Sequence, residues 1–235
     1  MADVTKSGKF VAIVTARYSS RRFPGKVLHE LHGRPMLAHT LDRLKSVDQL
    51  DEILVATSSD VSDEAIAEFA QASGFPAWRG QLDDVLGRLQ AAASAHNADA
   101  IVRISGDSPL LDPNLIRAVL ELFIRDRPDL ATNVFPRSFP KGQSVEVISR
   151  DALERLAYQA RLAEDREHVT RYAYSNPGRF SIRNFVAKTS RPELQLSVDT
   201  PADLDRAARL MVATQSIDGF PTVDQLIDLL DKEHR

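Results

Sequence analysis

The sequence predicts a doubly wound α/β fold built on a mainly parallel sheet. Short apolar runs alternate with segments whose apolar residues recur at helical spacing, which is typical of parallel strands joined by helices. The run at residues 10–14 has no polar interruption, as expected of a strand that is buried on both faces. The 235 residues, 43% of them hydrophobic, suffice for one large domain with a full core. We therefore expect a single domain over residues 1–235.

The first half of the chain contains four expected strands, of which the third is only a short extended piece. They cover residues 10–14, 53–57, 76–79 and 100–104. Helices are expected between them, the first after Pro35, which suits a first helical turn, and the second ending near Gly74. The apolar positions that define these three helices are Met36, Leu37, Leu41 and Leu44, then Ile66, Phe69 and Ala70, then Val85, Leu86 and Leu89.

The second half begins with a helix that Asp112 is expected to cap. The pattern then loosens, and we expect an inserted lobe at about residues 130–190. Thr200 is expected to cap a later helix, and a capping box at Thr222 opens the final one. The remaining expected elements are strands at 130–134, 145–148, 180–186 and 196–199, and a helical stretch at 151–175.

Composition excludes several classes of protein. The formal net charge of −3 gives no overall positive field for nucleic acid. The lack of cysteine excludes disulfides, thiolate metal sites and cysteine nucleophiles. No apolar run approaches the roughly 18 residues that span a bilayer, and the short polar N-terminus is unlike a secretory signal. We therefore expect a cytoplasmic protein without membrane insertion.

A cluster of cations follows the first expected strand. Arg17, Arg21, Arg22 and Lys26 lie within ten residues that contain a single glycine, Gly25. Ligands of open α/β sheets bind at the carboxyl ends of the strands, and arginine forks together with a lysine suit a polyphosphate. The segment is neither a Walker A loop nor a Gly-x-Gly-x-x-Gly fingerprint. The alternative is a solvated basic loop, and under either interpretation we expect it to be exposed.

Two aspartates follow expected strands and precede expected helices. Asp107 follows Gly106 in a turn, and Asp199 precedes Thr200. At strand ends both carboxylates would face the sheet edge that carries the basic loop, and Mg²⁺ needs few protein ligands besides water. Each aspartate alone could instead be structural, as a turn residue or a helix cap. Together with the basic loop they predict a metal-nucleotide site.

Other residues are weaker candidates. Arg79 follows the short extended piece, and Lys141, Glu146 and His168 in the lobe are candidates for sugar binding. Residues of these types more often form surface salt bridges than ligand contacts. The other histidines are not spaced as a metal cluster, and no nucleophile elbow is visible.

Three motifs resemble those of the sugar cytidylyltransferases, the group that contains the 3-deoxy-manno-octulosonate and acylneuraminate cytidylyltransferases. They are Ala-Arg-x-x-Ser-x-Arg-x-Pro-Gly-Lys at residues 16–26, Gly-Asp-x-Pro at 106–109 and x-Asp-Thr-Pro-x-Asp-Leu at 198–204. The resemblance covers about residues 10–212. Further matches, which favour the branch called spore coat polysaccharide biosynthesis protein F, lie at residues 55–58, 79–86 and 166–170.

The resemblance implies a nucleotidyltransferase fold, which is Rossmann-like, and a homodimer formed through the inserted lobe. It implies CTP and a sugar as substrates and Mg²⁺ as cofactor. The catalytic set would be Arg17, Arg22, Lys26 and Asp107. The residues carried over are Arg17, Ser20, Arg22 and Lys26 for the triphosphate, Asp107 and Asp199 for Mg²⁺, Arg79 near the nucleotide, and Ser105 for nucleotide or sugar.

The implied reaction is attack by a sugar hydroxyl on the α-phosphorus of CTP, giving a CMP-sugar and pyrophosphate for surface polysaccharide biosynthesis. A keto-sugar acid such as a nonulosonate is the expected acceptor. Two positions depart from the pattern: Ser197 stands where acylneuraminate enzymes have a second aspartate, and Ser144 where relatives of this branch often have one. The first departure argues against a strict sialic acid assignment, and the second, a lost carboxylate, argues for a changed sugar pocket. The sugar is therefore left open.

Two other functions are consistent with the same fold. A glycosyltransferase would favour an Asp-x-Asp motif, which is not present near the end of a central strand. A non-catalytic nucleotide-binding protein would not need Lys26, Asp107 and Asp199 together. The sequence does not distinguish CTP from other nucleoside triphosphates, because backbone groups can select the base.

Overall fold

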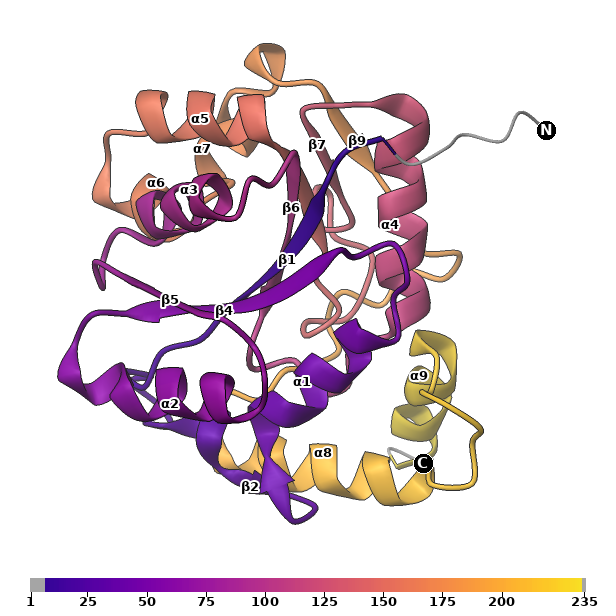
Figure 1. Ribbon diagram of the computed structural model, residues 1–235. Helices are drawn as coiled ribbons and strands as arrows, with labels where there is room; N and C mark the ends of the chain where they lie inside the picture. Colours follow the sequence, from indigo (N-terminus) through magenta and orange to yellow (C-terminus); the bar gives the residue numbers. More distant parts are fainter. Residues whose placement is uncertain (1–6, 234–235) are drawn as a thin grey trace.

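The computed structural model describes residues 7–233 and places helices on both faces of a mixed sheet (Figure 1). The sheet has seven strands in the order β5-β4-β1-β6-β8-β7-β9, beside a separate pair, β2-β3. Neighbours from β5 to β6 are parallel, β8 is antiparallel to β6 and β7, and β9 is parallel to β7. The predicted doubly wound, mainly parallel fold is confirmed. The strands are β1 Phe10–Thr15, β2 Glu30–Leu31, β3 Arg34–Pro35, β4 Glu52–Ser58, β5 Ala77–Gly80, β6 Ala100–Ser105, β7 Leu130–Thr132, β8 Glu146–Ser149 and β9 Ile182–Asn184.

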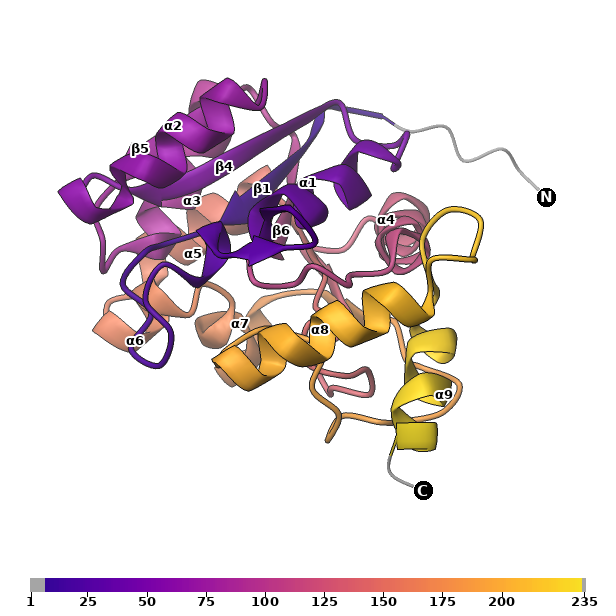
Figure 2. The ribbon, with the colours of Figure 1, turned by 90° about the horizontal axis from the view of Figure 1, so that it is seen from below.

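The helices follow the predicted order, and α8 and α9 lie side by side near the C-terminal end (Figure 2). Among the described residues, no helix is long and apolar enough to cross a membrane. The α-helices are α1 Met36–Lys45, α2 Glu64–Ala72, α3 Val85–Ala95, α4 Pro113–Asp126, α5 Arg150–Gln159, α6 Ala163–Glu167, α7 Arg171–Ser175, α8 Pro201–Ala213 and α9 Val223–Glu233, with 3₁₀ turns η1 Lys26–Leu28, η2 Val61–Asp63 and η3 Pro177–Arg179.

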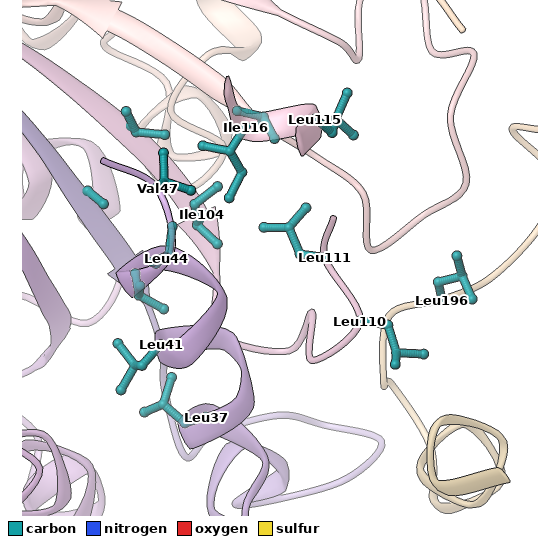
Figure 3. Close-up of a cluster of buried hydrophobic side chains, with 14 of the residues drawn as sticks. Leu37, Leu41, Leu44, Val47, Ile104, Leu110, Leu111, Leu115, Ile116 and Leu196 are labelled. Atoms are coloured by element: carbon teal, nitrogen blue, oxygen red, sulfur yellow. The ribbon is translucent and has the colours of Figure 1, made fainter. Parts of the chain in front are cut away.

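Side chains of β1 alternate between two hydrophobic clusters. Ala12 and Val14 belong to a cluster that includes residues of α1 and α4, part of which is drawn in Figure 3. Val11 and Ile13 belong to a second cluster, which includes residues of α3 and α5. Because helices cover both faces, all four of these side chains are fully buried. The continuous apolar run at residues 10–14 is explained by this double burial.

Two predicted elements in the second half are correct in type but not in extent. The helical stretch expected at 151–175 is divided into α5, α6 and α7. The chain becomes extended at Ala160, which follows α5, and Val169, with a φ of +34°, lies between α6 and α7. The strand expected at 180–186 is reduced to β9. It pairs in parallel with β7 and lies at the edge of the sheet.

The prediction of a strand at residues 196–199 is wrong, because the backbone of this segment forms hydrogen bonds with loops rather than with a neighbouring strand. The Leu196 N–H donates to Lys141 O (2.8 Å) and the Val198 N–H to Asp107 O (2.9 Å). Gly142 allows this close approach: its φ is +90°, and a Cβ there would lie 2.3 Å from Ser197 N. The segment is therefore fixed as an irregular strap beside the turn after β6.

Asp112 connects α4 to α9. Its Oδ1 accepts the Asn114 N–H (2.8 Å) and so caps α4, and its Oδ2 accepts the Val223 N–H (3.0 Å) at the start of α9. The predicted cap at Asp112 is confirmed. The predicted capping box at Thr222 is also present, because Thr222 and Gln225 each accept the other's backbone N–H.

We predict that Asp112→Ala lowers the free energy of unfolding by about 2 kcal/mol, because it removes a cap and leaves the buried Val223 N–H without its acceptor. Urea denaturation measures the change. Asp228→Ala on the exposed face of α9 is the matched control and should change it by less than about 0.5 kcal/mol. Equal effects in the two variants would contradict the tether between α4 and α9.

Candidate functional site

A cavity of about 840 Å³ opens at the carboxyl ends of β1 and β6. Its lining carries six arginine and lysine side chains against four carboxylates, an excess of positive charge that suits an anionic ligand. It collects residues distant in sequence, such as Lys26 and Asp199. The predicted candidates in the lining are Arg17, Ser20, Arg22, Lys26, Ser105, Asp107, His168 and Asp199.

The basic loop after β1 is held in a fixed shape. The Gly25 N–H donates to Tyr18 O (2.8 Å), and the Tyr18 N–H donates to Oδ1 of the fully buried Asp63 (2.6 Å). Gly25 has a φ of +68°, and a Cβ at this position would lie 2.6 Å from the Tyr18 ring. This glycine therefore lets the loop turn tightly against Tyr18 and carry Lys26 back to the sheet edge.

Lys26 lies between the two predicted aspartates. Its Nζ donates to Asp107 Oδ2 (2.6 Å), to Asp199 Oδ1 (2.8 Å) and to the carbonyl oxygen of Val198 (2.8 Å). Lys26 is only 8% exposed, so the expectation of an exposed loop is wrong at this residue. A buried ammonium needs such partners, because leaving it unpaired away from water would be costly.

The carboxylates of Asp107 and Asp199 have further partners. Asp107 Oδ1 accepts the Ser105 hydroxyl (2.7 Å), and Asp199 Oδ2 faces the Arg22 guanidinium (3.1 Å). Burial raises the pKa of Asp199, but the hydrogen bond and charge of Lys26, with the charge of Arg22, outweigh burial and lower it. Asp199 is therefore held as a carboxylate.

Neither aspartate caps the helix that follows it. The N-cap of α8 is Thr200, in a capping box with Asp203, and the N-cap of α4 is Asp112. Asp203 Oδ2 also accepts the Asp199 N–H (3.1 Å), so the capping box fixes the backbone at Asp199 while its side chain points elsewhere. The helix-cap alternative for Asp107 and Asp199 is therefore wrong.

The donor set fits a divalent cation that takes few protein ligands. Asp107 and Asp199 each place one carboxylate oxygen on the same ammonium, so both face one point in space. Within residues 7–233, no group of three or more His, Cys, Asp or Glu could hold a metal ion. A cation at this edge would thus depend on two carboxylates, with water and a phosphate-bearing substrate supplying the other oxygens, as Mg²⁺ permits.

Arg17 and His168 line the same cavity although they are far apart in the sequence. The Arg17 guanidinium contacts Glu167 Oε1 (3.0 Å), next to His168. The hydrogen bond from Arg17 is the main cause that lowers the pKa of Glu167. The loop after β1 and the end of α6 are therefore joined by an ion pair across the cavity.

Three predicted candidates do not line the cavity. Arg79 donates to the Ser58 and Asp60 carbonyls and pairs with Glu64. Lys141 is exposed, and Glu146 is buried. The Glu146 carboxylate accepts hydrogen bonds from Arg103, Thr170 and Tyr174.

Two cations that line the cavity, Arg88 and Arg103, were not among the site residues predicted from the sequence. Arg103 interrupts the apolar run of β6, and this interruption was a usable signal. Arg88 lies on α3 one turn after Val85, where helical periodicity alone would place an apolar residue. A charged residue on the buried face of an element is thus the feature that could have found both.

We predict that Lys26→Met lowers the free energy of unfolding by about 2–3 kcal/mol at pH 7, because two adjacent carboxylates lose their shared cation. Because the folded-state pKa of Asp199 is lowered, its ionised carboxylate stabilises the folded protein at neutral pH. This stabilisation is lost as pH falls through the folded-state pKa. The penalty of the substitution should therefore be smaller at about pH 3, below the ordinary pKa of an aspartate, than at pH 7.

Urea denaturation at both pH values measures this penalty. Lys188→Met is the control, because Lys188 is exposed, and its effect should be small and independent of pH. A penalty for Lys26→Met that is the same at both pH values would argue against the shared ion pair.

Comparison with known proteins agrees with the fold. A family model described as cytidylyltransferase matches residues 11–231. The 3-deoxy-manno-octulosonate cytidylyltransferase of Solibacter usitatus (strain Ellin6076) is 28% identical over 246 residues, covering 88% of this chain and 96% of its own. The spore coat polysaccharide biosynthesis protein SpsF of Bacillus subtilis (strain 168) is 27% identical over 200 residues, covering 82% of each chain.

A solved structure of a cytidylyltransferase from Leptospira borgpetersenii serovar Hardjo-bovis (strain JB197) superposes with a TM-score of 0.91 at 27% identity, covering 97% of this chain and 96% of that one. The predicted resemblance and the nucleotidyltransferase fold are thereby confirmed. Because the family model matches nearly all of the sequence, the chain belongs to the cytidylyltransferase family and is a nucleotidyltransferase enzyme.

Proposed function

We propose that this enzyme transfers CMP from CTP to a sugar and releases pyrophosphate, with Mg²⁺ as its divalent cation. The acceptor we propose is a keto-sugar acid, such as a nonulosonate, that is used for surface polysaccharide. One observation carries the proposal: cations of the loop after β1 meet Asp107 and Asp199 around Lys26 at one sheet edge. Family membership and the names of the two relatives support the choice of CTP and of a sugar acid.

In this reaction an oxygen of the sugar hydroxyl forms a bond to the α-phosphorus of CTP. The bond from that phosphorus to the β-phosphate oxygen breaks, pyrophosphate leaves, and the hydroxyl proton is released. No covalent bond to the protein is needed, because such transfer depends on positioning and on neutralising charge. Arg17, Ser20, Arg22 and Lys26 are the residues we propose to hold the phosphates.

Asp107 and Asp199 are the residues we propose to hold the cation. A bound Mg²⁺ would neutralise the charge that develops on the pyrophosphate leaving group. Ser105 fixes the Asp107 carboxylate through a 2.7 Å hydrogen bond and borders the space next to it. Arg22, whose partner in the free protein is Asp199, would be available to the triphosphate once a cation occupies that carboxylate.

The sugar side of the site is proposed at His168, which lines the cavity. Glu146 would act through Arg103, which it pairs with and which does line the cavity. Arg79 and Lys141 lie outside the lining, so we propose no direct substrate contact for them in this conformation. Ser197, which departs from the acylneuraminate pattern, and Ser144, which departs from the pattern of the branch relatives, remain the positions where the choice of sugar would differ.

We extend the proposal to a cytoplasmic homodimer of single-domain subunits, formed through the lobe at about residues 130–190. The lobe supplies β9, which is an edge strand with one paired side. Val186 nearby is an exposed apolar side chain. An edge strand with apolar neighbours is the kind of surface that proteins tend to cover.

The reaction is tested by measuring pyrophosphate release with the four nucleoside triphosphates against a panel of keto-sugar acids, with and without Mg²⁺. We expect release only with CTP, an accepted sugar and the cation. Sugar-nucleotide donors offered with a glycan acceptor serve as the counter-test. Turnover of these donors, without release from CTP, would replace the proposal by a glycosyltransferase, and CTP binding without turnover would indicate a non-catalytic protein.

We predict that Asp107→Asn and Asp199→Asn each raise the Mg²⁺ concentration needed for half-maximal activity by at least about 10-fold, because each removes one of two carboxylate ligands. The double variant should lose little more, since ligands that act as a unit are not additive. Asp205→Asn, on the exposed face of α8, is the matched control. An unchanged Mg²⁺ dependence in Asp199→Asn would remove that residue from the metal site.

A further inference from the structure

We propose that Arg88 binds phosphate oxygens of the nucleoside triphosphate from the α3 side of the cavity. The inference rests on the proposed function, because it takes the cavity as the nucleotide site. Arg88 lies in the first turn of α3, which Asp84 caps by accepting the Gly87 N–H (2.8 Å). Its side chain lines the cavity, yet the residue as a whole is only 3% exposed.

The Arg88 guanidinium is a buried cation that forms no ion pair with any residue that the structure describes. Its one hydrogen bond to a described residue runs from Nη1 to the Gln81 carbonyl oxygen (2.7 Å). Its Nε is buried and has no partner among residues 7–233. Burying a charge without a counter-charge costs several kcal/mol in free energy, so such a group needs an explanation.

The two carboxylates whose charges favour the cationic form of Arg88 are bound to other groups. Asp63 accepts the backbone N–H groups of Tyr18 (2.6 Å) and Ser58 (2.9 Å). Asp84 forms a bidentate ion pair with Arg166. Neither makes an ion pair with Arg88, so the structure leaves its charge to act on something that enters the cavity.

The electrostatic surroundings point to an anion of more than one charge. Burial is the main cause that lowers the pKa of Arg88, and the charge of Arg17 lowers it further, against the opposing effects of Asp63 and Asp84. Arg17 lines the same cavity. A polyphosphate between these guanidinium groups would relieve their repulsion, and planar guanidinium forks match phosphate oxygens.

The surrounding backbone is built to admit this side chain. Gly80 ends β5, and a Cβ there would lie 3.1 Å from Cγ of Arg88 and 3.2 Å from its Cβ. Glycine at this position leaves room for the stem of Arg88 to pass between β5 and the cavity. The alternative is a structural arginine, whose charge is balanced at a distance by Asp63 and Asp84 and which binds no ligand.

The experiment compares the wild-type enzyme with Arg88→Met and Arg88→Lys, using tripolyphosphate and CTP as probes in Mg²⁺ buffer. Isothermal titration gives the Kd and thermal denaturation gives the Tm of each free protein. We expect Arg88→Met to weaken both probes by about 10- to 100-fold, the range for losing a charge-assisted hydrogen bond. Arg88→Lys keeps a charge but not the fork, and should weaken them less.

The free Arg88→Met protein should be as stable as the wild type or more so, because a buried unpaired charge is replaced by an apolar side chain of similar size. Arg161→Met, outside the cavity, is the control and should leave both Kd values unchanged. Cytidine binding should not change in any variant. An equal loss for cytidine would assign Arg88 to the base and overturn the proposal.

Three further results would overturn the proposal. The first is that Arg88→Met binds tripolyphosphate with the Kd of the wild type, and the second is that the wild type does not bind tripolyphosphate. The third is that Arg88→Met unfolds while Arg88→Lys binds tripolyphosphate like the wild type. The proposed function fails differently, through the absence of CTP-dependent pyrophosphate release in the wild type. Selective loss of tripolyphosphate binding in Arg88→Met would support the inference even then.

Discussion

The ammonium of Lys26 is the group on which the rest of the site depends. It joins the loop after β1, the turn after β6 and the strap before α8 through three hydrogen bonds of 2.6–2.8 Å. These segments are far apart in the sequence, and only the first two follow neighbouring strands of the sheet. Because Lys26 and its partners are partly or wholly removed from water, each charge needs the others.

Parallel strands explain why these charges meet at one edge. β1 and β6 are neighbours in register, with Thr15 beside Ser105, and both end at the cavity. Asp199 reaches the same edge by another route, since it follows an irregular strap and is fixed by the capping box of α8. The capping box and the position of Asp199 in the cavity lining are thus parts of one arrangement.

Four of the six cations that line the cavity pair with carboxylates, and the other two are the exposed Arg21 and the buried Arg88. Lys26 shares Asp107 and Asp199, Arg22 pairs with Asp199, Arg17 pairs with Glu167, and Arg103 pairs with Glu146. Arg88 has no such partner among the described residues. An anionic substrate would therefore find most of the cations pre-positioned by carboxylates, and the buried Arg88 without a carboxylate to displace.

The sequence by itself determined the α/β class, the buried strands and the caps at Asp112 and Thr200, because these follow from local periodicity and local hydrogen bonding. It also identified the family and predicted that Lys26, Asp107 and Asp199 meet at one edge, although the strand expected before Asp199 is absent. Only the tertiary structure decided that Lys26 is buried between the aspartates and that Arg88 and Arg103 enter the cavity while Arg79 turns away. Residues 196–199 form a strap rather than a strand for the same reason: their partners are chosen by contacts between distant segments, which local patterns do not encode.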